Sequence, residues 1–361
     1  MYRISFCTAI RNRLHHLKQT LKQNIEDNSS YPELQFVILD YNSDDGLTEW
    51  ISTEMSFYLS SGKVVYYRTE DPAFFDRSHS RNLAFKLAEG DIICNIDADN
   101  FTGENFADYI NNLFQSTPGI FITSGKLEAK IRPDFLGRIG VRKSDFLAVG
   151  GYDEKMDGYG FEDIDLINRL IRYGLSQHKI NQKAFFRAVF HSDEERILEE
   201  RKMKLIVRLY ISHINPSESD VILLFGDNKF QKGRVINTGT QHSQEPSRVV
   251  NNHKTTGQFT LAETDWQTGG WFIEKGCLTL SIDNNNVLFK VQRRCLLSEN
   301  GQQFFWATDP AIISNLIMFN SQFSNKKRMK DKQVKEINNA GIWGQGNVSK
   351  NLDMAQMIQI T

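Results

Sequence analysis

Asp97 and Asp99 are the first pair of residues whose types and spacing could do chemistry. They follow directly on the apolar stretch Ile92–Ile96. Such a stretch is typical of a central strand covered on both faces of an α/β sheet. Ligands of open α/β sheets bind beyond the carboxyl ends of the strands, where a cation and a phosphate could be received. Because two neighbouring carboxylates repel each other, a divalent metal between them is the simplest interpretation.

Glu162 and Asp163 are the second such pair, within the block GYGFEDIDLINRL. They follow a loop that contains four glycines and two tyrosines, which favours a flexible segment allowing close approach. One interpretation is helix capping, because acidic residues in the first turn of a helix are favoured by its dipole. The other is general-base catalysis, because a like-charged neighbour raises the pKa of one carboxyl group.

The elements that must position these residues alternate between strand and helix. Strands are predicted at residues 3–9, 34–39, 64–67, 91–97 and 120–123, with helices after the first three and a helix at 101–114 after the fourth. This alternation predicts a mostly parallel sheet. Thr8, Asp40 and Asp97 all fall at strand carboxyl ends, so we expect them to share one rim.

Two nucleotide-binding motifs are absent from the sequence. No GxGxxG follows the first strand, and no GxxxxGK[ST] occurs anywhere. This argues against a dinucleotide enzyme and a P-loop NTPase. A phosphate would instead be held by a metal on Asp97 and Asp99, with Arg77 or Arg81 nearby.

Length and composition indicate a soluble globular protein. A chain of 361 residues favours two domains, and the hydrophobic and charged contents, 40% and 24%, are ordinary. Residues 1–200 contain 23 Lys+Arg against 31 Asp+Glu, whereas residues 201–361 contain 20 against 13. The basic second half could face an acidic glycan or a membrane surface, or could simply be a solvated basic surface.

Cysteine usage and hydropathy predict a cytoplasmic protein. The four cysteines show no metal-ligand spacing and are expected to be reduced. A strand pattern begins within the first residues, so no secretory leader is expected, and no apolar run approaches membrane-spanning length. Peripheral membrane contact remains an open expectation, and no nucleic-acid partner is expected.

Five motifs in order carry a family resemblance: the first strand, DYNSDDG, RNLAFKLAEGD, DAD and GYGFEDIDLINRL. Together they resemble the inverting A-type glycosyltransferases of the family-two kind, over roughly residues 1–200. The last block is similar to the acceptor block of β-1,4-galactosyltransferases and chondroitin-type polymerases. The resemblance implies an α/β, Rossmann-like domain that binds a nucleotide sugar.

The resemblance also implies site residues. It assigns the nucleotide sugar to Thr8, Ala9, Arg11, Asp40, Arg77, Arg81, Asn82, Asp97 and Ala98. It places the metal on Asp97, Asp99 and His191, the catalytic base on Asp163, and the acceptor on Tyr159, Gly160 and Glu162. Tyr159 stands where the galactosyltransferases commonly have tryptophan, a departure at the position that contacts the acceptor sugar.

His191 lies 28 residues after Asp163, about where these relatives place a third metal ligand. An imidazole beside carboxylates suits Mn²⁺ better than Mg²⁺. The alternative for His191 is a residue at the start of a helix. His178, the nearest other histidine, falls in a polar turn and is expected to be exposed.

The implied reaction is transfer of a hexose, of the galactose or N-acetylgalactosamine type, from a UDP-sugar to a hydroxyl of a glycan or glycoconjugate in surface polysaccharide synthesis. Retaining relatives typically carry Asn at the place of Asp163, so the aspartate favours inversion. One alternative is a nucleotidyltransferase, which would normally have a Gly-rich loop after the first strand; residues 8–13 contain no glycine. The other is a non-catalytic glycan-binding protein on a transferase fold.

The second half of the chain is predicted to be an accessory domain. A long helix is expected at residues 196–213, and NPSESD suggests a boundary that separates a catalytic domain, 1–214, from a β-rich domain, 215–361. Alternating runs between residues 255 and 309 predict a β-meander or small sandwich. The run Lys326–Glu336 is predicted to be an exposed helix, with contact to an acidic glycan or lipid surface as the alternative.

Overall fold

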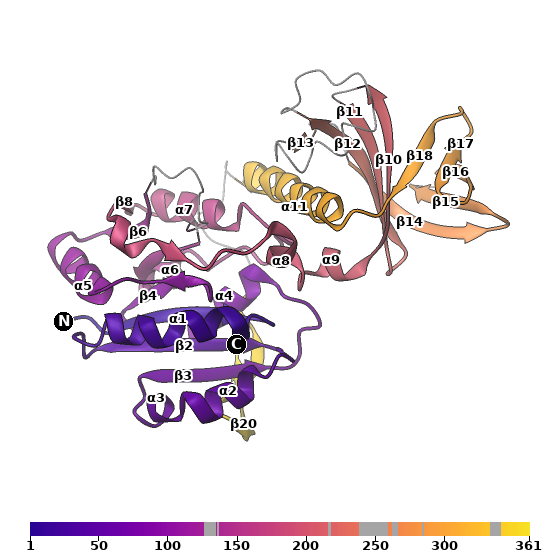
Figure 1. The fold of residues 1–361 in the computed structure, drawn as a ribbon. Coiled ribbons are helices and arrows are strands. Elements are labelled where there is room, and N and C mark those ends of the chain that lie inside the picture. The colour runs from indigo at the N-terminus through magenta and orange to yellow at the C-terminus, as the bar shows by residue number, and fades with distance from the viewer. Residues whose placement is uncertain are drawn as a thin grey trace. The chain divides into compact units, whose positions relative to one another are not determined.

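The chain forms two compact units in its computed structural model. The structure describes residues 1–125, 135, 137–215, 218–237, 259–261, 266–283, 285–332 and 341–361. Unit 1 comprises residues 1–191 together with 325–361, and unit 2 comprises residues 192–324. The C-terminal residues therefore belong to the same unit as the N-terminus (Figure 1).

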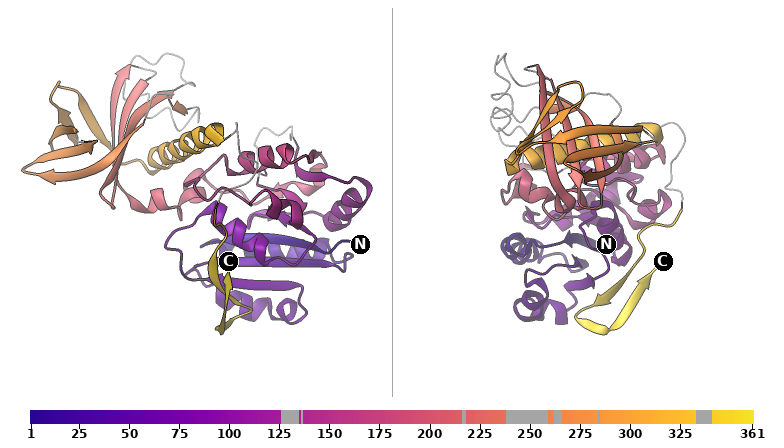
Figure 2. Two further views of the ribbon diagram at one scale, coloured as in Figure 1. Left: turned by 180° about the vertical axis from the view of Figure 1, so that it is seen from behind. Right: turned by 90° about the vertical axis from the view of Figure 1, so that its right-hand side faces the viewer.

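Unit 1 is built on a sheet with the strand order β20-β19-β3-β2-β1-β4-β7-β6-β8. The strands are β1 (Ile4–Ile10), β2 (Leu34–Tyr41), β3 (Val64–Thr69), β4 (Ile92–Asn95), β6 (Ile120–Ser124), β7 (Gly140–Arg142), β8 (Ser176–Ile180), β19 (Gly346–Lys350) and β20 (Asp353–Ile360). Strands β3, β2, β1 and β4 are parallel, as predicted from the alternating pattern. The hairpin β19–β20 extends the edge of the sheet at β3 in antiparallel orientation and is the yellow hairpin of Figure 2.

Helices cover both faces of this sheet. They are α1 (Leu14–Asp27), α2 (Leu47–Glu54), α3 (Ser56–Ser60), α4 (Arg77–Leu87), α5 (Phe106–Ser116), α6 (Lys143–Ala148), α7 (Glu162–Arg172) and the short 3-10 helix η1 (Lys183–Phe185). Successive strand residues point to opposite faces. In β2, Phe36 and Ile38 therefore join a core with α1, α2 and α5, whereas Val37 and Leu39 join a core with α4, α6 and α7. Helix α5 begins five residues later than predicted.

Strand β4 has the buried character that its sequence predicts. Ile92, Ile93 and Cys94 are fully buried, with neighbours β1 and β7 on either side. The carboxylates Asp97 and Asp99 follow where the strand ends. The predicted placement of this pair is therefore confirmed.

Unit 2 contains an antiparallel β-barrel. Its elements are α8 (Asp193–Ile197), α9 (Arg201–Leu205), β10 (Ile206–Asn215), β11 (Glu218–Phe225), β12 (Lys229–Asn237), β13 (Phe259–Leu261), β14 (Gln267–Glu274), β15 (Cys277–Ile282), β16 (Asn285–Val291), β17 (Cys295–Ser298), β18 (Gln303–Ala307) and the first part of α11 (Pro310–Lys332). Consecutive barrel strands pair in order, and β18 pairs back with β10, so the ring closes with β13 as an addition on β12. Closure leaves the ring without free strand edges. Tyr210, Phe230, Phe289 and Phe304 belong to its buried core.

Two predictions about the second half differ from the structure. The long helix predicted at 196–213 is wrong: α8 and α9 are short, and β10 begins at Ile206. This segment contains β-branched and aromatic residues, Ile206, Val207, Tyr210 and Ile211, which favour a strand. A short apolar run alone does not distinguish a strand from a helix. The units also divide elsewhere than at 214/215, which falls at the end of β10. Deleting residues 215–361 would therefore remove β19 and β20 as well as most of unit 2.

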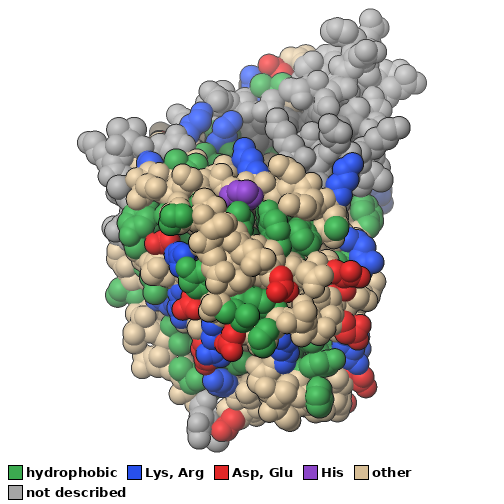
Figure 3. Space-filling model, turned by 90° about the vertical axis from the view of Figure 1, so that its left-hand side faces the viewer, with side chains coloured by type: hydrophobic (Ala, Val, Ile, Leu, Met, Phe, Trp, Pro, Cys, Tyr) green, Lys and Arg blue, Asp and Glu red, His purple; other side chains and the backbone are tan. Residues whose placement is uncertain are grey.

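Surface features bear on the expected membrane contact. The described residues include no helix that is both long and apolar enough to span a membrane. On the face shown in Figure 3, lysines and arginines lie interspersed with aspartates and glutamates. The predicted basic helix is present as far as Lys332, the end of α11, and the remainder of the run Lys326–Glu336 lies outside the described residues.

Candidate active site

The rim where β1, β2 and β4 end brings the predicted residues together. Ile10 pairs with Asp40, and Cys7 pairs with Asn95. The Ile96 amide donates to the Cys7 carbonyl, and the Thr8 hydroxyl donates to the Ile96 carbonyl at 2.6 Å. Thr8 is thus buried and holds the chain just before Asp97, while Ala9 beside it is half-buried.

Asp97 is held in its charged form. Its Oδ1 accepts a hydrogen bond from Asn95 at 2.9 Å and lies 3.4 Å from Nη2 of Arg81. Burial alone would raise the pKa of Asp97, but the charges of Arg81 and Arg77 and the Asn95 hydrogen bond lower it below its usual range. The side chain is 34% exposed, so an ionised carboxylate remains accessible at the strand end.

Asp99 lies next to His191. The Nε2 atom of His191 is 3.5 Å from Oδ2 of Asp99. The short strands β5 (Asn100–Phe101) and β9 (Arg187–Ala188) pair, and the Val189 amide donates to the Asp99 carbonyl, which carries the chain to His191. The structure therefore brings His191 to the Asp-Ala-Asp segment, as the resemblance implies. His178 instead lies half-buried in β8, with Nε2 3.3 Å from the hydroxyl of Tyr109.

Arg138 is a buried cation beneath this segment that the sequence analysis missed. Its guanidinium donates to the carbonyls of Phe101 and Phe185 and to Oδ1 of Asn100. Aromatic rings surround it, including that of Phe135 at 5.0 Å. Burial lowers the pKa of Arg138 to about 10. Arg138 thus joins the strand after Asp99 to the segment that leads to His191.

A polar stripe on α1 holds the other side of the same segment. The hydroxyl of Thr20 donates to the Ala98 carbonyl, Asn24 donates to the Asn100 carbonyl, and Asn28 donates to the Thr102 hydroxyl. These side chains recur every fourth residue along α1 and its C-terminal cap, Asn28, and therefore lie on one side of the helix.

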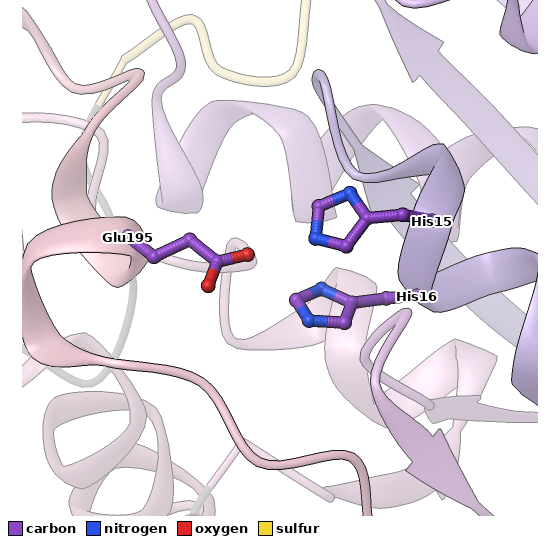
Figure 4. Close-up of side chains that lie close together, drawn as sticks. All are labelled: His15, His16 and Glu195. Atoms are coloured by element: carbon purple, nitrogen blue, oxygen red, sulfur yellow. The ribbon is translucent and has the colours of Figure 1, made fainter.

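His16 continues this stripe toward the start of α1. Its ring lies 5.4 Å from that of His191 and 4.1 Å from that of His15, centroid to centroid. Figure 4 shows both histidines on α1. The four-residue spacing is the signal that could have revealed the stripe in the sequence.

The glycine loop adopts a backbone that favours glycine. Gly150, Gly151, Gly158 and Gly160 all have positive φ, and Phe161 follows with φ 71°. Helix α7 then begins at Glu162. Glu162 and Asp163 are buried rather than displayed on a solvated helix end. Helix capping alone does not explain two buried carboxylates, so their partner matters.

That partner is Arg81 of α4. Its Nη1 lies 2.9 Å from Oδ1 of Asp163 and 3.4 Å from Oε1 of Glu162, and its Nη2 reaches Asp97. Burial alone would lower the pKa of Arg81. The negative charges of Asp163 and Asp97 outweigh this effect, so the pKa lies well above its ordinary value. One guanidinium therefore joins both predicted carboxylate pairs.

Arg77 and Tyr159 lie beside this centre. The Arg77 guanidinium lies 4.9 Å from the centre of the Tyr159 ring and 5.9 Å from that of Phe75. Its charge also contributes to lowering the pKa of Asp97. The predicted acceptor residue and a predicted phosphate-binding residue are thus in contact.

Three other predicted binding residues have structural partners. Asp40 is fully buried and accepts from the Ser43 amide, Tyr66 and Arg68 at 2.6–2.7 Å. Asn82 is also fully buried and bonds to both backbone groups of Tyr152. The Arg11 guanidinium donates to the backbone carbonyls of residues 41, 72 and 73. Asp40 and Asn82 thus hold neighbouring backbone segments in place by hydrogen bonds.

The residue types around Asp97 and Asp99 suit a divalent cation. Two carboxylates and an imidazole form a donor set that suits Mn²⁺. A Cβ added at Gly137 would lie 3.1 Å from Oδ2 of Asp97 and 2.7 Å from Nη2 of Arg81, so glycine leaves this side of the carboxylate open. The carboxylates Asp97, Asp99, Glu162 and Asp163 outnumber the cations Arg77, Arg81 and Arg138, so the net negative charge favours a bound cation.

Comparisons with known families agree with this geometry. A model of glycosyl transferase family 2 matches residues 5–121, and a model described as the N-terminal domain of galactosyltransferase matches residues 126–192. No curated protein matches the chain.

The chain is similar to several solved structures at low sequence identity. A mannosyltransferase from Pyrobaculum calidifontis in complex with GDP-Man and Mn²⁺ is 16% identical, with 54% of this chain and 61% of that chain covered and a TM-score of 0.45. S. aureus TarS is 14% identical, with 52% and 60% covered and a TM-score of 0.43. A mutant Drosophila β-1,4-galactosyltransferase 7 with manganese, UDP-Gal and xylobiose is 17% identical, with 54% and 74% covered and a TM-score of 0.38. The chain spans about three fifths of the length of the first two proteins.

Residues 5–192 are an α/β glycosyltransferase domain. The domain is of the family-two type and carries a galactosyltransferase-like block. The resemblance inferred from the ordered motifs is thereby confirmed.

Proposed function

We propose that the protein is a metal-dependent, inverting hexosyltransferase. It transfers a hexose of the galactose or N-acetylgalactosamine type from a UDP-sugar to a hydroxyl group of a glycan or glycoconjugate acceptor, in surface polysaccharide synthesis. The galactosyltransferase model over residues 126–192 supports the type of hexose. The two carboxylate pairs joined by Arg81 support the reaction.

The contact of Arg81 with both pairs is the observation that carries the proposal. A transferase must place a nucleotide diphosphate and an acceptor hydroxyl on opposite sides of one anomeric carbon. Asp97 stands at the strand end, where α/β domains receive phosphates. Asp163 begins α7 behind the glycine loop. Arg81 donates toward both carboxylates, so it fixes their relative position.

In the proposed mechanism the chain's own residues hold the donor and take the proton. Mn²⁺ held by Asp97, Asp99 and His191 would supply positive charge for the leaving diphosphate. Arg77 and Arg81 add positive charge beside Asp97. Asp163 accepts the proton of the acceptor hydroxyl, Glu162 orients that hydroxyl, and Tyr159 supports the acceptor ring. A single displacement from the opposite face inverts the anomeric centre.

The experiment that tests this proposal is a donor screen by UDP or GDP release. UDP-galactose, UDP-N-acetylgalactosamine, UDP-glucose, UDP-N-acetylglucosamine and GDP-mannose are offered with Mn²⁺ and a panel of mono- and disaccharides. We expect turnover with a UDP-hexose, loss of turnover in Asp97→Ala and Asp163→Asn, and an inverted anomer by NMR. Full activity in either variant would overturn the role of that residue. Turnover with GDP-mannose alone would overturn the donor class, and a retained anomer would overturn the mechanism.

A further inference from the structure

The glycine loop before α7 is anchored on one side by α4. Asn82 donates to the Tyr152 carbonyl at 3.0 Å and to Oε1 of Glu154 at 2.8 Å, and its own Oδ1 accepts from the Tyr152 amide. The loop contains four glycines with positive φ, a backbone with few intrinsic restraints. Its position therefore depends on contacts from outside.

The C-terminal residues of unit 1 supply such contacts through Asp153. Nε and Nη2 of Arg328 lie 2.6 and 3.2 Å from the two Asp153 oxygens. Nζ of Lys332 lies 2.6 Å from Oδ2. The Asp153 side chain is only 5% exposed. Burial alone would raise the pKa of Asp153, but Arg328 and Lys332 lower it. A buried carboxylate with two cationic partners is a strong restraint on the loop.

Asn325 restrains the other end of the loop. Its side-chain amide donates to the Gly160 carbonyl at 2.9 Å, and Asn325 is itself buried. Gly160 is followed by Phe161 in the left-handed conformation, and then by Glu162 and Asp163. A shift of this carbonyl would move the start of α7 and with it both carboxylates.

Trp343 and Gly344 complete the set. The Gly344 amide donates to Oε1 of Glu154 at 2.6 Å. A Cβ added at Gly151 would lie 2.6 Å from the Trp343 ring, so the ring packs directly on the loop backbone. Lys86 lies over the same ring and donates to the Trp343 carbonyl. Trp343 thus closes against both the loop and α4.

We propose that residues 325–332 and 341–344 form a C-terminal clamp that sets the position of loop 150–161 and, through it, the position of Asp163 relative to the acceptor hydroxyl. Asn325, Arg328, Lys332 and Trp343 are positioning residues for the acceptor half of the site. These residues contact loop 150–161 directly, whereas Asp97 is linked to Asp163 only through Arg81. The kinetic consequence of the clamp rests on the proposed function. Its structural consequence, the position of the loop, rests on the contacts alone.

The test compares Arg328→Gln with two matched variants in the full chain. Arg328→Lys keeps the charge opposite Asp153, and Lys326→Ala removes an exposed cation from the same helix. Hydrogen–deuterium exchange of peptides covering residues 150–161 should speed up at least about tenfold in Arg328→Gln, a loss of about 1.4 kcal/mol of local protection. Arg328→Lys should be intermediate, and Lys326→Ala should match the wild type.

Kinetics then separate positioning from general stability. With UDP-galactose, Mn²⁺ and the best saccharide of the acceptor panel, the acceptor KM should rise and kcat should fall in Arg328→Gln, while the donor KM changes less. Unchanged exchange in loop 150–161 would overturn the clamp. Equal effects on the donor and acceptor KM would overturn its specific link to the acceptor. Because exchange and calorimetric binding of UDP with Mn²⁺ need no turnover, failure of the proposed function remains distinguishable from failure of the clamp.

Discussion

The guanidinium of Arg81 lies 2.9 Å from the carboxylate of Asp163. The same guanidinium reaches Asp97 at 3.4 Å. Asp97 follows a strand, Asp163 lies in the first turn of a helix, and Arg81 comes from the helix that precedes both in sequence. A change in any one of the three should therefore be felt at the other two.

Replacing Asp163 with asparagine should separate chemistry from binding. Asparagine keeps the shape of the side chain but cannot accept the proton of the acceptor hydroxyl. We expect kcat to fall by about 10²–10⁴-fold. Binding of UDP with Mn²⁺, measured by calorimetry, should persist. Glu104→Gln, a change at an exposed acid, is the control. A kcat within tenfold of the wild type would mean that another residue acts as base.

Arg81→Met should make stability depend on metal. The substitution leaves Asp97, Glu162 and Asp163 without their shared cation, and a broken buried ion pair typically costs about 3–5 kcal/mol. Mn²⁺ bound beside Asp97 would offset part of this repulsion. Urea unfolding should therefore show a larger stabilisation by Mn²⁺ in Arg81→Met than in the wild type. Arg81→Lys, which keeps the charge, should be the milder change. Equal stabilisation by Mn²⁺ in all three proteins would contradict the shared electrostatic centre.

Local sequence features predicted most of the parallel sheet and both carboxylate pairs. An apolar run that stops at Asp97 and a glycine loop that stops at Glu162 are visible within about fifteen residues each. The pairing of β1, β2 and β3 follows from their order in the chain and from the right-handed crossovers that connect parallel strands. The part of the site at the carboxyl ends of β1, β2 and β4 could therefore be predicted from the sequence alone.

Contacts across long sequence distances could not be predicted in the same way. Arg81 and Asn82 are neighbours in the RNLAFKL motif, yet one bonds to Asp163 and the other to the Tyr152 backbone. Only the direction of each side chain on α4 separates these roles. The composition of residues 325–361 did not indicate that they belong to unit 1. Their basic run is typical of any helix on a solvated surface.

Asp40→Asn should reduce stability rather than nucleotide affinity. Asp40 is fully buried, and its carboxylate accepts from Arg68, Tyr66 and the Ser43 amide. Removing its charge leaves the Arg68 cation with Glu70 as its remaining carboxylate partner, so we expect a loss of about 1–3 kcal/mol in urea unfolding. Calorimetric affinity of the folded protein for UDP should remain. Asp44→Asn, an exposed change in the same loop, is the control. Loss of UDP affinity without loss of stability would restore the direct nucleotide role implied by the resemblance.

Metal binding should depend on both Asp99 and His191. Their side chains lie 3.5 Å apart at the end of the β5–β9 pairing. We expect Asp99→Ala and His191→Ala each to weaken Mn²⁺ binding, as measured by electron paramagnetic resonance. Changes in the outer shell of a metal site typically lower metal affinity by about 10–100-fold, and we expect the loss in these two variants to be at least that large. Arg138→Met, which removes the support for this pairing, should show the outer-shell effect. His178→Ala is the matched histidine control. Unchanged Mn²⁺ affinity in His191→Ala would limit the site to carboxylates.

The Asp153 ion pairs should make part of the stability depend on acid pH. Arg328 and Lys332 hold the pKa of Asp153 below its ordinary value of about 3.9, against the effect of burial. An aspartate with a lowered pKa in the folded state contributes stability that is complete above the unfolded pKa and is lost as the pH falls through the folded pKa. The difference in unfolding free energy between wild type and Asp153→Asn should thus be constant from about pH 5 to about pH 7 and shrink below about pH 4. Each unit of lowered pKa contributes about 1.4 kcal/mol to that difference. Urea unfolding at a series of pH values measures it, and a difference that persists undiminished at about pH 2 would show that the carboxylate charge is not what holds the loop.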